Sequence, residues 1–95
     1  MKMGRVIGSV VATRKDPSLD GVKLLVVQHL ALDMKSAGEY VVAVDAVGAG
    51  LSDVVLFAAG SSARQTEVTR DRPVDAVIMA IVDSFDADGK TVRLT

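Results

Sequence analysis

Short apolar runs alternate along the chain with clusters of polar residues, glycine and proline. Runs of this length, bounded by turn-forming residues and rich in β-branched side chains, predict β-strands. In the first run, Val6, Gly8 and Val10 share one face of the expected strand, and glycine inside a strand indicates a bend, a bulge or a close backbone approach. We expect strands at residues 3–13, 22–30, 40–47, 53–59, 75–85 and 91–94.

Turn-forming residues separate the expected strands. Asp20 and Gly21 tolerate the positive φ of a tight turn, so the first two strands are expected to form a hairpin. Asp88 and Gly89 give a stronger hairpin signal before the last strand. The expected turns and loops are residues 14–21, 33–39, 48–50 and 86–89.

One short helix is expected between the fourth and fifth strands. Ser62 and Gln65 match a capping box, in which the hydroxyl accepts from the third helical amide and Gln65 reaches back. Pro73 disfavours helical geometry at Arg72, so the helix ends after one or two turns. A charged connector, residues 67–72, follows it.

Composition supports a small β-rich fold. Seventeen of the 95 residues are Val, 49% are apolar and only 3% are aromatic, so the core consists of small branched aliphatic side chains. We predict an all-β fold: a five-to-six-stranded barrel, OB-fold-like, with one short helix between strands four and five. It forms a single domain over residues 1–95. So much aliphatic surface on a short chain also favours a subunit interface.

Charge is unevenly distributed. The net charge is −1, with +3 over residues 1–35 (six Lys/Arg, three Asp) and −4 over residues 36–95 (five Lys/Arg, nine Asp/Glu). This balance argues against a protein that mainly neutralises nucleic-acid phosphates. The asymmetry has two interpretations: a mixed solvated surface, or complementary faces on neighbouring copies.

The sequence lacks the features of disulfide-bonded, thiolate-metal, secreted and membrane-spanning proteins. There is no Cys, so neither disulfides nor thiolate metal sites are expected. The N-terminal apolar stretch is too short for a signal peptide, and no run reaches the length of a membrane span. We expect no membrane partner, no metal, no cofactor and a cytoplasmic location.

Isolated polar residues in the strands are expected to be structural. His29 is the only histidine and has no second His or Cys to share a metal or a catalytic role. Asp45 and Asp83 lie within apolar strands, where a hydrogen-bonded or ion-paired role is favoured over acid–base chemistry. Arg14 and Arg64 are candidate ion-pair partners, across subunits as well as within one.

Catalytic and nucleotide-binding motifs are incomplete. Gly48 and Gly50 do not form a dinucleotide-binding fingerprint, because Asp53 stands at the third glycine's place. Ser61 and Ser62 lack the nucleophile-elbow context. We expect no catalytic residues.

Several segments, in order, resemble the bacterial microcompartment vertex family of the EutN/CcmL type. They are residues 8–16 (GSVVATRKD) with Leu19 and 21–25 (GVKLL), 42–50 (VAVDAVGAG) with 53–56 (DVVL), 60–64 (GSSAR), 73–76 (PVDA) and 81–83 (IVD). The resemblance spans residues 4–83. Leu51 and Ser52 depart from it, since a small residue or glycine is expected there.

This resemblance implies a non-catalytic shell protein that forms homopentamers and closes the five-fold vertices of a carboxysome or metabolosome shell, beside hexameric shell proteins. The expected axial loop comprises Gly48, Ala49 and Gly50. The expected subunit interface comprises Arg14, Ser61, Ser62, Ala63 and Arg64. Rings of five and six need the same kind of interface, so the number five rests on the resemblance.

Two alternatives belong to other function classes. An OB-like barrel that binds single-stranded nucleic acid needs stacking aromatics surrounded by basic residues, and this chain offers only Tyr40, Phe57 and Phe85. An oligomeric enzyme with a site between subunits needs convergent polar groups, which the sequence does not display.

Overall fold

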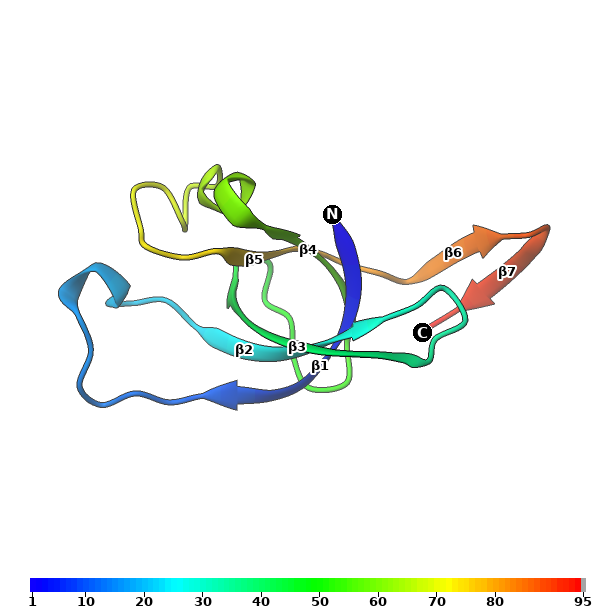
Figure 1. Ribbon diagram of the computed structural model, residues 1–95, viewed down its shortest axis with the longest axis horizontal. Coiled ribbons are helices and arrows are strands. Elements are labelled where there is room, and N and C mark those ends of the chain that lie inside the picture. The colour runs from blue at the N-terminus through cyan, green and yellow to red at the C-terminus, as the bar shows by residue number, and fades with distance from the viewer. Residues whose placement is uncertain (95) are drawn as a thin grey trace.

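The computed structural model describes residues 1–94, and over this range the protein consists of strands and two short 3-10 helices (Figure 1). In chain order these are β1 (Lys2–Val10), η1 (Pro17–Leu19), β2 (Leu24–Leu30), β3 (Ser36–Asp45), β4 (Val54–Ala59), η2 (Gly60–Arg64), β5 (Ala76–Ile81), β6 (Ser84–Ala87) and β7 (Lys90–Arg93). The predicted all-β class is confirmed.

Five strands close into a barrel in the order β1-β2-β3-β5-β4, with β1 also paired to β4. All neighbours are antiparallel except β3 and β5, which are parallel and meet at two residue pairs, Val44↔Val77 and Asp45↔Ile78. The predicted small barrel with a short helix between strands four and five is therefore confirmed. The last two strands form a separate two-stranded sheet.

The barrel interior is filled by aliphatic side chains of modest size. Val27, Val55 and Ile78 have no accessible surface, and Phe57 is the one aromatic residue among the buried side chains of the described chain. Alternation along each strand puts these side chains on the inner face. The main cluster comprises Val6, Leu25, Val27, Ala43, Ala49, Val55, Phe57, Ala76 and Ile78.

Gly4 shows why the first strand contains glycine. A Cβ at this position would clash with Val27 Cγ1 and would lie 2.8 Å from the backbone oxygen of Gln28. At Gly8, by contrast, a Cβ would meet nothing within 4 Å, and the register of β1 against β2 shifts between Val6 and Gly8. The expected close approach is at Gly4, and the expected irregularity lies next to Gly8.

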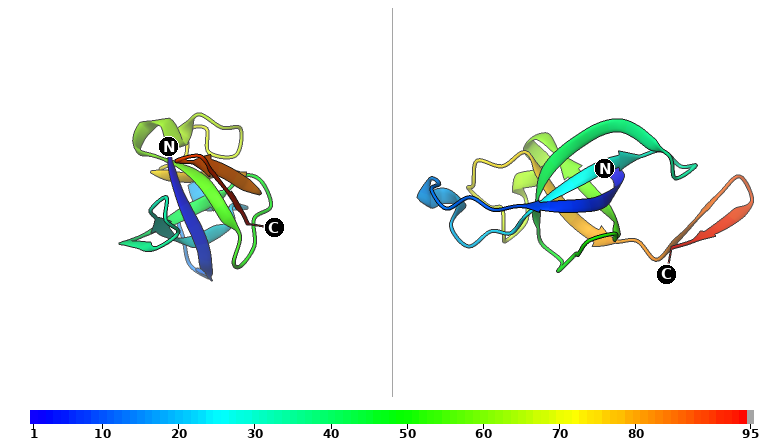
Figure 2. Two further views of the ribbon diagram at one scale, coloured as in Figure 1. Left: turned by 90° about the vertical axis from the view of Figure 1, so that its right-hand side faces the viewer. Right: turned by 90° about the horizontal axis from the view of Figure 1, so that it is seen from below.

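The molecule is elongated, measuring 46 × 23 × 22 Å. The long β1–β2 connection, with η1, projects from one end of the barrel, and the β6–β7 hairpin projects from the other (Figures 1 and 2). The accessible surface is 5977 Å², against about 5,200 Å² for a compact monomer of this mass. The chain thus presents more surface than its size requires.

The third strand begins four residues earlier than predicted. The loop expected at 33–39 is reduced to a tight turn, in which Ala31 N donates to Lys35 O and Met34 adopts a φ of 69°. Residues from Ser36 onward then extend β3 beyond the core as an exposed segment. A strand exposed on both faces has no apolar alternation, so the pattern indicated a loop.

The predicted strand 75–85 is two strands. Barrel pairing ends at Ile81, Val82 N donates to Val54 O, and the chain then leaves the barrel to enter β6. The apolar run is interrupted by Asp83 and Ser84, the polar residues at which the chain leaves the barrel, so the sequence does contain a signal for this break. Asp88 and Gly89, with φ of 52° and 72°, form the predicted hairpin turn.

The expected capping box is wrong. Helix η2 is a 3-10 helix that begins at Gly60, and its N-cap residue, Ala59, makes no side-chain cap. Ser62 lies inside the helix and donates its hydroxyl to Ala59 O at 2.8 Å. Gly60, with a φ of 69°, turns the chain out of β4 two residues before the expected start.

Candidate assembly surfaces

The loop after β3 is fixed by a single carboxylate. Asp45 Oδ1 accepts hydrogen bonds from the backbone amides of Val47, Gly48 and Ala49 at 3.1–3.2 Å. Gly48 has a φ of 79°, which favours glycine. The hydrogen-bonded role predicted for Asp45 is confirmed, and its partners are backbone amides rather than an arginine.

Three further side chains hold the other half of this loop. Asp53 Oδ2 accepts from Gly50 N at 2.8 Å, Lys23 Nζ donates to Ala49 O at 3.2 Å, and Arg5 donates to Ser52 O at 3.1 Å. The sequence does not mark Arg5 and Lys23 as loop anchors. A basic residue in an otherwise apolar predicted strand is also typical of an ordinary solvated position.

The loop presents apolar side chains outward. Leu51 is 72% exposed and Val47 is 40% exposed, whereas Ala49 is buried in the barrel core. Of the three residues predicted to form an axial loop, only Gly48 and Gly50 therefore have accessible surface of their own to offer. A rigid loop with exposed hydrocarbon at its tip suits a packed contact with another protein surface.

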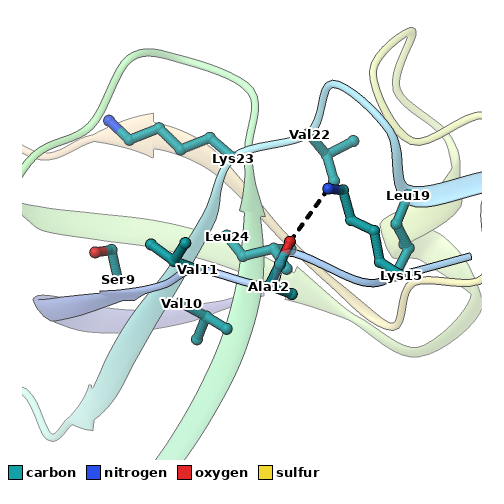
Figure 3. A pocket seen from close by; sticks show the side chains of 9 residues that line it. All are labelled: Ser9, Val10, Val11, Ala12, Lys15, Leu19, Val22, Lys23 and Leu24. Carbon is teal, nitrogen blue, oxygen red and sulfur yellow. Dashed lines mark hydrogen bonds between the residues drawn. The ribbon is translucent and has the colours of Figure 1, made fainter.

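The β1–β2 connection forms a second surface, adjacent to this loop. Residues 11–17 are exposed, with Val11 at 87%, and the connection encloses a hollow of about 360 Å³ that Figure 3 shows from close by. Lys15 Nζ donates to Ala12 O across it. The lining residues are Ser9, Val10, Val11, Ala12, Lys15, Leu19, Val22, Lys23 and Leu24.

This hollow continues into a second one along β1. The two share Ser9 and Lys23, and the second is also lined by Ile7, Gly50 and Leu51. A largely apolar surface therefore runs from the tip of the loop at Leu51 along β1 to Val11. Patches of this kind on soluble proteins mark interaction sites.

Hydrogen bonds fix the far end of the β1–β2 connection. Asp16 Oδ1 accepts from the hydroxyl of Ser18 at 2.7 Å and from its amide at 2.9 Å, and these bonds lower the pKa of the Asp16 carboxyl. Arg72 donates to the backbone oxygens of Ser18 and Asp20. The connection is thus joined to the segment that precedes β5.

Helix η2 has one buried residue and an exposed outer side. Ala63 is completely buried and packs with Val44, Ala58 and Val77. Its side chain fastens η2 to the barrel and has no surface to offer a neighbour. The other residues predicted for the interface in this segment are exposed: Ser61, Ser62 and Arg64. Arg14, also exposed, lies in the β1–β2 connection, so one protomer does not bring it to η2 (Figure 1).

The aromatic residues do not form a stacking surface. Phe57 is in the core, with the His29 ring edge-on to it at a centroid distance of 6.2 Å, and Phe85 lies on the hairpin outside the barrel. Tyr40, 62% exposed, is the remaining aromatic side chain of the barrel. Stacking of successive bases requires several exposed rings on one face.

Within residues 1–94, no three His, Asp or Glu side chains are grouped closely enough to hold a metal ion. Within the same range, neither helix has the length and hydropathy needed to cross a bilayer.

A family profile described as "Ethanolamine utilisation protein EutN/carboxysome" matches residues 1–83. The chain belongs to this EutN/CcmL family. The carboxysome shell vertex protein CcmL of Synechococcus elongatus is 46% identical over 92 residues, covering 97% of this chain and 93% of the relative.

Solved structures of family members superpose closely. CcmL of Gloeobacter violaceus matches with a TM-score of 0.91 at 45% identity, over 96% of this chain and 94% of that one. GrpN from Rhodospirillum rubrum, described as a pentameric microcompartment shell protein, matches with a TM-score of 0.83 at 44% identity, over 92% of this chain and all of that one. The resemblance predicted from the sequence is confirmed.

The EutN/CcmL profile ends at residue 83, where the chain leaves the barrel. The match to the Gloeobacter CcmL structure covers 96% of the 95 residues, or about 91, so it extends past residue 83 into the hairpin. The hairpin therefore has a counterpart in CcmL, although the family profile does not include it.

Proposed function

We propose that this chain is a structural shell protein that assembles into homopentamers at the vertices of a bacterial microcompartment in the cytoplasm. The observation that carries the proposal is the superposition on pentameric GrpN, at 44% identity and over the whole of that chain. Full-length matches to carboxysome shell vertex proteins give independent support.

The shape of the protomer suits such a ring. A cyclic ring uses two different surfaces, each meeting its complement on the next copy. This protomer has a different projection at each end, and a surface with exposed Val11 and Leu51 runs along β1. Five-fold rings supply the curvature that flat layers of hexagonal tiles lack, so hexameric shell proteins are the proposed neighbours.

We assign the loop at Gly48–Gly50 to the ring axis. Hydrogen bonds from the loop amides to Asp45 and Asp53 keep the loop rigid. Gly48 allows close approach of backbones. Leu51 then provides exposed hydrocarbon next to the axis. We assign Arg14, Ser61, Ser62 and Arg64 to contacts between neighbours, with Ala63 holding η2 in position for them.

The protein is proposed to have no catalytic activity and no cofactor. The half-buried carboxylates that acid–base chemistry would use already accept structural hydrogen bonds from backbone amides: Asp45 from three of them and Asp53 from one. The single histidine packs edge-on against Phe57 in the barrel wall. These polar groups serve the fold.

Native mass spectrometry of the purified protein tests the oligomer directly. Five copies of the 9.9 kDa chain give a species near 50 kDa. A monomer at micromolar concentration, or a six-fold species, contradicts the proposal. In cells, deletion of the gene without a substituting paralogue is expected to leave shells elongated or unclosed, and normal polyhedra in electron micrographs would overturn the shell role.

The axial assignment has its own test. Leu51→Asp places several carboxylates around the proposed axis, where their repulsion weakens the ring. Val68→Asp is the matched control, since Val68 is another exposed apolar residue, on the segment that precedes β5. Loss of the 50 kDa species in the first variant alone is expected. An intact ring with Leu51→Asp contradicts the axial position.

A further inference from the structure

The β6–β7 hairpin stands away from the barrel and leaves an open cleft beside it. The cleft has a volume of about 580 Å³ and lies between the hairpin and the β2–β3 turn. Leu32, on the turn, is 66% exposed although it is a large aliphatic residue. The lining residues are Leu32, Asp33, Ala87, Asp88, Lys90 and Val92.

The hairpin makes few stabilising contacts within one protomer. An isolated two-stranded hairpin is marginally stable in water, and β6 and β7 pair only with each other. Phe85 pairs with Val92 on one face, and this face also carries Ala87 and borders the cleft. Phe85, Ala87 and Val92 are only half-buried within one protomer, so they leave apolar surface that a further segment can cover.

We propose that the cleft holds residues 10–15 of a second copy, an inference that rests on the ring under Proposed function. This segment is exposed along its length, and beyond Val10 it belongs to no strand. Val11, at 87% exposure, is the most exposed large apolar side chain of the described residues. Segment and cleft lie at opposite ends of the 46 Å long axis, as a head-to-tail contact requires (Figure 1).

Charge complementarity selects this segment as the occupant. Arg14 and Lys15 add two positive charges immediately after the apolar Val10 and Val11. The cleft offers the carboxylates of Asp33 and Asp88, offset in part by Lys90. Val10 and Val11 would contact Leu32 and the hairpin face, while Arg14 meets the acidic rim.

Disulfide trapping tests the contact, because the chain has no native cysteine. In the full-length double variant Val11→Cys with Val92→Cys, oxidation is expected to join copies head to tail and to give a covalent ladder up to five chains. The β1–β2 connection, which contains Val11, and the β6–β7 hairpin, which contains Val92, project from opposite ends of one protomer, so the two cysteines cannot react within a chain (Figure 1). The control pair, Val11→Cys with Arg93→Cys, uses the opposite face of the hairpin and is expected to give no ladder.

The outcomes separate this inference from the proposed function. A 50 kDa native species without a ladder contradicts the contact between residues 10–15 and the cleft, and it leaves the proposed pentamer unaffected. A monomer by native mass contradicts both. Equal ladders from both cysteine pairs also contradict the contact, because they indicate random collision.

A charge exchange provides a second readout that does not depend on cysteine chemistry. Arg14→Glu is expected to raise the protomer concentration at half assembly about tenfold, whereas the control Arg70→Glu leaves it unchanged. Adding Asp33→Lys to Arg14→Glu is expected to recover most of the loss. If the double variant assembles no better than Arg14→Glu alone, Arg14 does not meet this cleft.

Discussion

Every barrel strand has hydrogen-bonded neighbours on both sides and inward side chains with almost no accessible surface, whereas the β6–β7 hairpin has one pairing and half-buried side chains. Val77 and Val92 illustrate the contrast, since the first is completely buried and the second only partly. The same residue type therefore stabilises the protomer at one place and remains available for a partner at another. Residues needed for folding and residues free for assembly are largely separate.

The largest difference between barrel and hairpin is expected from truncating one core side chain. Ile78→Ala removes a fully buried side chain and is expected to lower the free energy of unfolding by about 3–5 kcal/mol. The matched change in the hairpin, Val92→Ala, is expected to lower it by about 0.5–1 kcal/mol. Denaturant unfolding at one fixed protomer concentration measures both. Equal effects would contradict the separation of roles.

A smaller loss is expected at Gly4. Gly4→Ala forces a methyl group against Val27 and the backbone of Gln28, and we expect the free energy of unfolding to fall by about 2–3 kcal/mol. Gly8→Ala is the control on the same strand, because its Cβ meets nothing within 4 Å and its φ needs no glycine. A near-neutral result at Gly4 would show that β1 can move outward.

The loop after β3 is anchored to the barrel and also belongs to a proposed assembly surface, so a variant there tests both roles. Asp45→Ala leaves three amides without their acceptor and is expected to lower the free energy of unfolding by about 1–2 kcal/mol. Faster hydrogen exchange at Gly48 and Ala49 should accompany the loss. Asp83→Ala, at an exposed carboxylate outside this loop, is expected to change stability by less than about 0.5 kcal/mol.

The smallest effect concerns Asp16 in the exposed connection. Hydrogen bonds from Ser18 lower the pKa of Asp16 below its ordinary value of 3.8, so their stabilisation is present above that pH and is lost as the pH falls through the lowered pKa. Ser18→Ala is expected to raise this pKa towards 3.8 by removing the hydroxyl donor. An NMR titration of the carboxyl carbon measures it, and an unchanged pKa would assign the shift to the amide alone.

The sequence predicted the elements whose apolar side chains all face one core. The boundaries of β2 and β4 lie within two residues of prediction, because their apolar runs end where burial ends. The start of β3 was wrong, since Ser36 and its neighbours are exposed on both faces. The capping box was wrong because Gly60 turns the chain before Ser62 is reached.

The candidate surfaces were predictable only as segments. Motifs placed the loop at Gly48–Gly50, but the burial of Ala49 follows from closure of the barrel around it. The anchoring roles of Arg5 and Lys23 depend on contacts 47 and 26 residues away along the chain. Local patterns contain no information about such partners. The assignments of Arg14, Ser61, Ser62 and Arg64 to an interface stay predictions.

The parallel seam between β3 and β5, only two residue pairs long, sets an order for folding. The strands β1, β2 and β3 are joined by local connections and can pair early, whereas Val44 and Val77 must meet across 33 residues of chain. The chain loses the entropy of closing this loop before the contact forms. We therefore expect barrel closure to be the slow step of folding. Until then a three-stranded ribbon presents bare edges, so newly made chains are most prone to aggregate in the interval before closure.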